Sequence, residues 1–84
     1  MPTVTVPNSG GFRIFFYSSD GVEAPHVHVR KGDGEVKYWV ALGGVRLARV
    51  RGMSRQDRRL AKQVVVENVA TILEAWHAYF SANH

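Results

Sequence analysis

The sequence predicts a small α+β domain, in which an antiparallel sheet of three to four strands packs against one long C-terminal helix, in β-β-β-β-α order. Two observations carry this prediction. Glycine and proline occur along the chain as far as Gly52 and are absent after it. Before that glycine, apolar residues alternate with polar ones, as in half-buried strands; after it they recur at steps of three and four, as on one face of a helix.

The length of 84 residues is enough for one domain. We therefore expect a single domain over 1–84, with strands within about 3–50 and the helix over about 55–81. The chain has no cysteine, which excludes disulfides, thiolate metal sites and a cysteine nucleophile. It has neither a run of roughly 18 apolar residues nor the pattern of a signal peptide. A cytoplasmic protein without membrane association is expected.

The first strand is expected over 12–18, a segment rich in aromatic and β-branched residues and bounded by glycine-containing turns. Arg13 interrupts one face of this strand. The even positions of the other face are all apolar and should point to the core: Phe12, Ile14 and Phe16. The segment over 20–25 is expected to be a turn or loop, with Pro25 fixing the approach to the next strand.

The next two strands, over 26–31 and 35–42, form a hairpin closed by a two-residue Gly32-Asp33 turn. Counting back from this turn pairs Arg30 with Glu35 and His26 with Trp39. The register separates an apolar face from a polar one, which supports it. The apolar face holds Val27, Val29, Val36, Tyr38 and Val40, and the polar face holds His26, His28, Arg30, Glu35, Lys37 and Trp39.

A fourth strand is expected over 45–50, with Val45, Leu47 and Arg49 on one face. Ser54, followed by Asp57, is typical of a helix N-terminus. The Val64-Val65-Val66 run has poor helix propensity, so packing against the sheet must hold this part of the helix. The apolar face of the helix is formed by Ala61, Val65, Val69, Ile72, Trp76 and Phe80.

The formal net charge is +4, and most of the excess lies in one segment. Residues 1–44 hold four basic and four acidic side chains, whereas 45–62 hold seven basic side chains against Asp57 alone. Such a strip suits nucleic acid or an acidic partner, although it also serves as a solubilising surface. The candidate binding residues are Trp39, which can stack on a base, and the strip itself: Arg46, Arg49, Arg51, Arg55, Arg58, Arg59 and Lys62.

The segment 25–30 carries the most distinctive chemistry, because His26 and His28 project from the same side of a strand. A histidine pair can act as general base and general acid on a phosphodiester, with Arg30 and Lys37 stabilising the charged phosphate. A metal-independent ribonuclease would need this set of candidate catalytic residues. Its alternative is a structural role, with both rings on a half-exposed sheet face and His26 packed against Trp39.

The same two imidazoles also resemble part of a divalent metal site. Two ligands are too few for structural zinc, however, and no nearby cysteine or obvious carboxylate completes the set. His77 on the expected helix and His84 in the tail after it would join only if the tail folded back. No metal and no other cofactor is therefore predicted, and a metal-binding accessory domain ranks third among the functional interpretations.

Three segments together resemble a family of small bacterial proteins, domain-of-unknown-function family 4160. They are GFRIFFYS over 11–18, PHVHV over 25–29 and LEAWHAYF over 73–80, so that the resemblance extends from about Val4 to Phe80. It implies a stand-alone domain often encoded beside a second small protein, in a toxin–antitoxin-like module whose toxin is this domain. It implies that His26 and His28 are signature positions, and it carries no catalytic role for them.

The resulting hypothesis is a toxin-like member of a two-protein module that binds a cognate small protein and acts on RNA. Whether it is an enzyme stays open. If it is one, a metal-independent ribonuclease activity is expected. The alternative is a non-enzymatic interaction module whose sheet face or edge strand pairs with a partner. The sequence predicts no oligomeric state.

Overall fold

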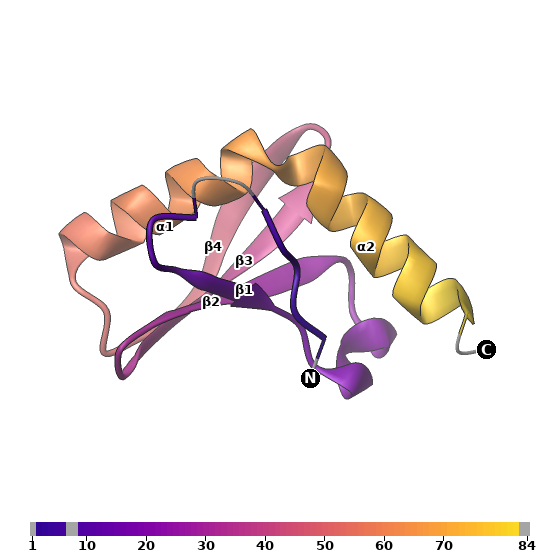
Figure 1. Cartoon of the computed structure of the whole chain (residues 1–84), viewed down its shortest axis with the longest axis horizontal. Coiled ribbons are helices and arrows are strands. Elements are labelled where there is room, and N and C mark those ends of the chain that lie inside the picture. The colour runs from indigo at the N-terminus through magenta and orange to yellow at the C-terminus, as the bar shows by residue number, and fades with distance from the viewer. Residues whose placement is uncertain (1, 7–8, 83–84) are drawn as a thin grey trace.

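Figure 1 shows a computed structural model of the chain, which describes residues 2–6 and 9–82. The elements are β1 (Arg13–Phe15), a 3-10 helix η1 (Ser18–Val22), β2 (His26–Lys31), β3 (Gly34–Ala41), β4 (Gly44–Arg51), α1 (Arg55–Glu67) and α2 (Val69–Ala82). The four strands form one antiparallel sheet in the order β1-β2-β3-β4. The predicted α+β class is therefore confirmed.

The β2–β3 hairpin has the predicted register. Lys31 pairs with Gly34 across a two-residue turn, and the ladder continues to the His26–Trp39 pair. Gly32 in this turn has a φ of 59°, a left-handed conformation that glycine adopts without a steric penalty. The predicted Arg30–Glu35 cross-strand pair is formed, with 2.8 Å between the guanidinium and the carboxylate.

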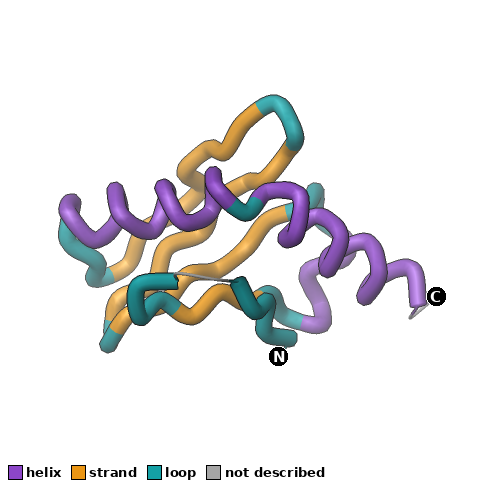
Figure 2. The backbone as a smooth tube through the Cα atoms, turned by 45° about the horizontal axis from the view of Figure 1, so that its top comes forward, coloured by secondary structure: helices purple, strands orange, loops and turns teal. Residues whose placement is uncertain are grey.

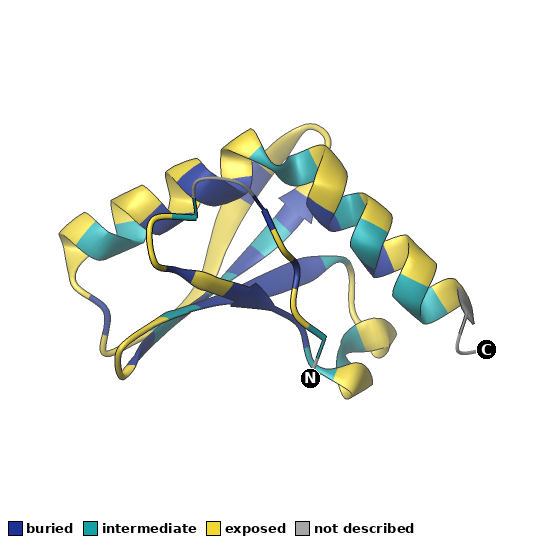
Figure 3. Cartoon of the chain, viewed as in Figure 1, coloured by how far each residue is buried: buried dark blue, intermediate teal, exposed yellow. Residues whose placement is uncertain are grey.

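Both α-helices cover one face of the sheet (Figure 2), which is called the inner face below; the opposite face is the outer face. The residues between the sheet and the helices are buried (Figure 3), and they include every apolar hairpin residue expected in the core. The helices supply the predicted stripe, of which Ala61, Val65, Ile72 and Trp76 are buried and Val69 and Phe80 partly so. None of the described helices is both long and apolar enough to cross a membrane.

The first strand is shorter than predicted, because β1 ends at Phe15 and the chain then enters η1. The predicted inward set is correct: Phe12, Ile14 and Phe16 are all buried. Phe15 faces the outer side opposite His28, yet it too is fully buried. A 3-10 helix over 18–22 takes the place of the predicted end of this strand and of the start of the turn or loop expected over 20–25, and it closes over this end of the outer face (Figure 1).

The prediction that Val45, Leu47 and Arg49 share a face is wrong at Arg49. Leu47 pairs with Tyr38 but Arg49 pairs with the adjacent Lys37, so Ala48 is an extra residue in a β-bulge. A bulge places two residues opposite one and shifts the alternation of side chains beyond it. Arg49 therefore joins the outer face, together with Arg46 opposite Trp39 and Arg51 opposite Glu35.

The long helix predicted over 55–81 is broken at Asn68 into α1 and α2. The Asn68 side chain donates to the Val64 carbonyl at 2.8 Å, and its backbone leaves the helical conformation. Asparagine competes in this way with the backbone pattern of a helix. A straight helix over 55–81 would be about 40 Å long, longer than an eight-residue strand of about 27 Å. The break lets α2 turn toward η1 (Figure 1).

The start of the helical region agrees with the prediction. Ser54 is the N-cap of α1, and its hydroxyl accepts from the Asp57 amide at 3.0 Å.

The bulge gives a test of the fold. Deleting Ala48 leaves β4 with a regular alternation and the same faces, so this variant should retain a cooperative thermal unfolding transition by circular dichroism. Deleting Lys37 is the matched control, because it shifts β3 by one residue against the regular β2 ladder and turns Tyr38 and Val40 outward. That variant should lack the transition. A bulge-deleted protein as unfolded as the control would contradict the assigned register.

Candidate functional site

The histidine pair lies on the outer face of β2, but it is not half-exposed as the structural alternative assumes. His26 is fully buried and His28 is 3% exposed. The His26 ring lies 5.3 Å from the ring of Trp39, as predicted, and 5.1 Å from that of Trp76 on α2. The His28 ring packs against the rings of Phe15 and Tyr17, which also contact each other. Both imidazoles are thus enclosed in a wall of aromatic rings.

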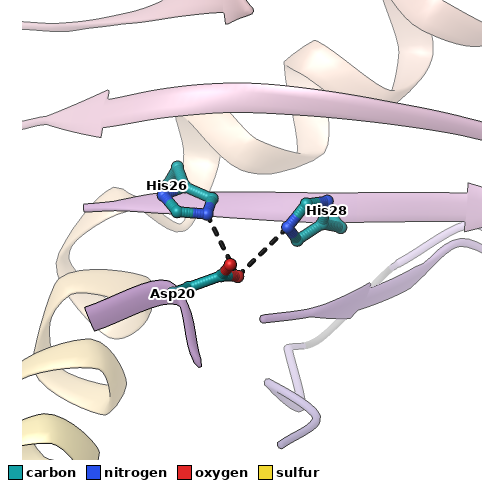
Figure 4. Close-up of side chains that lie close together, drawn as sticks. All are labelled: Asp20, His26 and His28. Carbon is teal, nitrogen blue, oxygen red and sulfur yellow. Dashed lines mark hydrogen bonds and ion pairs between the residues drawn. The ribbon is translucent and has the colours of Figure 1, made fainter. Parts of the chain in front are cut away.

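Asp20 of η1 closes this enclosure. Its Oδ2 atom lies 3.0 Å from His26 Nε2 and 3.1 Å from His28 Nε2 (Figure 4). The same oxygen accepts a hydrogen bond from the Tyr17 backbone amide at 2.8 Å, which anchors the first turn of η1. One carboxylate oxygen therefore joins η1 to both histidines of β2.

The second nitrogen of each ring also faces an acceptor. His26 Nδ1 lies 2.9 Å from the Ala24 carbonyl, and His28 Nδ1 lies 3.4 Å from Glu35 Oε2. His26 Nε2 is close to Asp20 without the geometry of a hydrogen bond. Among the described residues, His26 Nε2 and His28 Nδ1 are buried without a hydrogen-bond partner. Burial lowers the pKa of His28, an effect that the Asp20 carboxylate opposes.

The α2 helix holds η1 in position from the other side. The Tyr79 hydroxyl donates to Ser18 Oγ at 3.1 Å. A Cβ atom built on Gly21 would come within 2.5 Å of the Phe80 ring, so only glycine permits this approach. The turn of α2 at Asn68 thus contributes to the burial of the histidine pair.

The two other candidate catalytic residues share the outer face with the histidines but are engaged with carboxylates. Arg30 pairs with Glu35, and Lys37 pairs with Glu23 at 2.8 Å. The Lys37 ammonium also lies 4.4 Å from the centre of the Trp39 ring, in a cation–π contact. The hydrogen bond from Lys37 lowers the pKa of Glu23. The structure therefore brings the four candidates together without leaving the histidines open to a substrate.

The predicted basic strip is divided by β4 into two surfaces. On the outer face, Lys37, Arg49 and Arg51 line a hollow of about 270 Å³ together with Glu35 and Val50. The second hollow, of about 230 Å³, lies between β4 and α1. It is lined by Tyr38, Leu47, Arg55, Arg58, Arg59 and Lys62.

Sequence reasoning missed Asp20, because a single aspartate in a loop carries no periodic signal. The prediction that no carboxylate completes the histidine set is wrong, because Asp20 lies within hydrogen-bonding distance of both rings. His77 is exposed on α2 and is not a member of this cluster, and His84 lies outside the described residues.

A family model described as "Domain of unknown function (DUF4160)" matches residues 11–77. The chain belongs to this family. The matched part of this DUF4160 domain includes Asp20, both histidines and the whole of β4. No curated protein and no solved structure matches the chain. The family description assigns no activity, so function has to be argued from the surfaces described above.

Burial of the histidine pair can be tested by chemical modification. With diethyl pyrocarbonate at neutral pH, we expect fast carbethoxylation of the exposed His77 and slow modification of His26 and His28, read by peptide mass spectrometry. In denaturant all three should react at similar rates, which controls for intrinsic reactivity. Modification of His28 at the rate of His77 in the folded protein would contradict the enclosed site.

Proposed function

We propose that this DUF4160 domain binds single-stranded RNA through the outer face of β3 and β4, as the toxin-like member of a two-protein module. The observation that carries the RNA-binding part is the cluster of cations on the outer face, where the β4 bulge places Arg49 and Arg51 beside Arg46. The proposed role of the domain in a two-protein module comes from the resemblance of its sequence to the DUF4160 family.

The charge on this face supports binding to a phosphate backbone. Arg46, Arg49 and Arg51 are exposed and lie opposite every second residue of β3. Such positions are about 7 Å apart along a strand. For Arg46 and Arg49, the described part of the chain offers no carboxylate within ion-pair distance, and Arg51 has only a 3.7 Å contact with Glu35. Such cations bind phosphates and release counterions from nucleic acid.

An aromatic ring beside these cations supports contact with bases. Trp39 is partly exposed and lies opposite Arg46. A hollow of about 190 Å³ runs alongside it, lined by Ala24, Pro25, Trp39, Val40, Ala41, Gly44 and Arg46. Sheet faces that combine aromatic rings with basic side chains are a recurrent platform for single-stranded RNA, because every base has a face that can stack.

RNA cleavage by the histidine pair has less support than RNA binding. A general base has to come within hydrogen-bonding distance of the proton that it removes, and the surrounding aromatic rings and Asp20 leave both histidine rings buried. The proposed activity is therefore binding, and it does not depend on His26 or His28.

The edge of β4 favours a second candidate, the pairing of an acidic peptide from a cognate partner. In the described sheet β4 has a neighbour only in β3, so its other edge is open to an added strand. Cations flank this edge on both sides, and Leu47 is 49% exposed beside it. Charges and bulges also protect edge strands from unwanted pairing. For this reason we place the peptide second.

The RNA proposal can be tested by fluorescence anisotropy with a labelled single-stranded oligonucleotide over a range of salt concentrations. Replacing Arg49 and Arg51 by alanine should weaken binding and lower the salt slope by about one for each of these arginines that binds a phosphate. Trp39→Ala should cost about 1–3 kcal/mol if one base stacks on the ring.

The matched control is Arg59→Ala, which removes an exposed cation on the other side of β4 and should leave RNA affinity nearly unchanged. Wild-type protein that fails to bind the oligonucleotide at low salt would overturn the proposal. If a co-expressed neighbouring gene product is retained instead, and Leu47→Glu releases it, the peptide-pairing candidate is favoured.

A further inference from the structure

Three metal-ligating atoms converge under η1. Asp20, His26 and His28 each offer one such atom, and these atoms lie within 4.8 Å of one another; Asp20 Oδ2 is close to both Nε2 atoms. Figure 4 shows the two rings projecting from β2 with the Asp20 carboxylate between them. Metal bonds of about 2.0–2.2 Å at angles of 90° to 109° place neighbouring ligand atoms roughly 3.0–3.4 Å apart. The two nitrogen–oxygen distances, 3.0 and 3.1 Å, fall in this range.

Two neutral imidazole rings have too few N–H donors for the oxygen acceptors that surround them. A neutral imidazole has one N–H donor and one lone pair. Each ring nevertheless faces an oxygen acceptor at both nitrogens. Two neutral rings therefore present two lone pairs to acceptor oxygens, and His26 Nε2 is a fully buried nitrogen that lies 3.0 Å from Asp20 Oδ2 without a hydrogen bond. Leaving a buried polar atom unpaired is costly.

We propose that Asp20, His26 and His28 form a binding site for a divalent first-row transition metal ion of the zinc class. Such an ion accepts the Nε2 lone pairs of both rings and one oxygen of Asp20. Two imidazoles and a carboxylate match the preference of these ions for nitrogen and oxygen ligands. A three-residue set leaves a further coordination position, which water or another small ligand fills.

The surroundings of the two rings fit this role. When Nε2 of each ring binds the metal, the single N–H of each neutral ring is at Nδ1. There His26 donates to the Ala24 carbonyl and His28 faces the Glu35 carboxylate. Metal-bound histidines characteristically donate their other N–H to a carbonyl or carboxylate, which fixes the tautomer and the ring orientation. A bound metal would thus give His26 Nε2 a partner and leave each Nδ1 facing an oxygen.

The ion would act mainly on the position of η1. Asp20 belongs to η1 and both histidines belong to β2, so the metal joins two segments that meet through the contacts of Asp20 Oδ2 with both rings. Asp20 is the member of the set nearest to solvent, with its side chain 14% exposed, and entry of the ion is expected from its side. This inference does not depend on the proposed RNA binding, which uses β3 and β4.

The test is titration of the untagged, metal-free protein with Zn²⁺ by isothermal calorimetry, and with Co²⁺ by visible absorption. We expect stoichiometric binding that is abolished in Asp20→Asn, a nearly isosteric change. Glu35→Gln should lower the affinity by about 10- to 100-fold, as outer-shell changes do. His77→Gln is the matched control, because it removes an exposed histidine that is not a member of the cluster and should leave binding unchanged.

The absence of binding to wild-type protein, or equal affinity of wild type and Asp20→Asn, would overturn the site. Loss of binding in His77→Gln would do the same by assigning the metal to the surface of α2. If Asp20→Asn does not fold, long-range ¹H–¹⁵N spectra of the wild-type imidazoles decide the question. Zn²⁺ should shift Nε2 of His26 and His28 while both Nδ1 atoms stay protonated, and unchanged Nε2 signals would contradict the proposal.

Discussion

The alternation of side chains along the β2–β3–β4 ladder is the constraint on which the rest of the structure depends. Once the two-residue Gly32-Asp33 turn sets the register, every second hairpin residue points to the helices and the others point away. The bulge at Ala48 then changes the alternation at one position of β4. This single extra residue keeps Val50 in line with inner-face residues and places Arg49 and Arg51 on the outer face beside Arg46.

The outer face has two parts with different chemistry. Over β1 and β2, η1 and the end of α2 enclose two histidines and the carboxylate of Asp20. Over β3 and β4, the sheet is open and carries cations around Trp39. The enclosed part suits an ion that satisfies buried nitrogen atoms, and the open part suits a large anionic partner. The DUF4160 family model matches residues in both parts and assigns a role to neither.

Much of this architecture could be predicted from the sequence, because period-two and period-3.6 patterns record which residues are buried. The hairpin register, the core and the helical stripe follow from such patterns. The bulge, the break at Asn68 and the burial of the histidines do not. Each depends on one residue with no periodic signal: Ala48 in a regular-looking strand, Asn68 between apolar runs, and Asp20 in a segment expected to be a loop. The Gly21 contact with Phe80, which holds η1 in place, joins segments about sixty residues apart and is visible only in the fold.

The central claim is that binding occurs on the open part of the outer face and leaves the enclosed histidines aside. Nuclear magnetic resonance mapping tests it most directly, by titrating the ¹⁵N-labelled protein with a short single-stranded RNA. The account predicts shifts of the Trp39 indole, of Lys37 and of the backbone of β4, with the imidazoles of His26 and His28 nearly unchanged. Shifts centred on those imidazoles, or confined to α1, would contradict it.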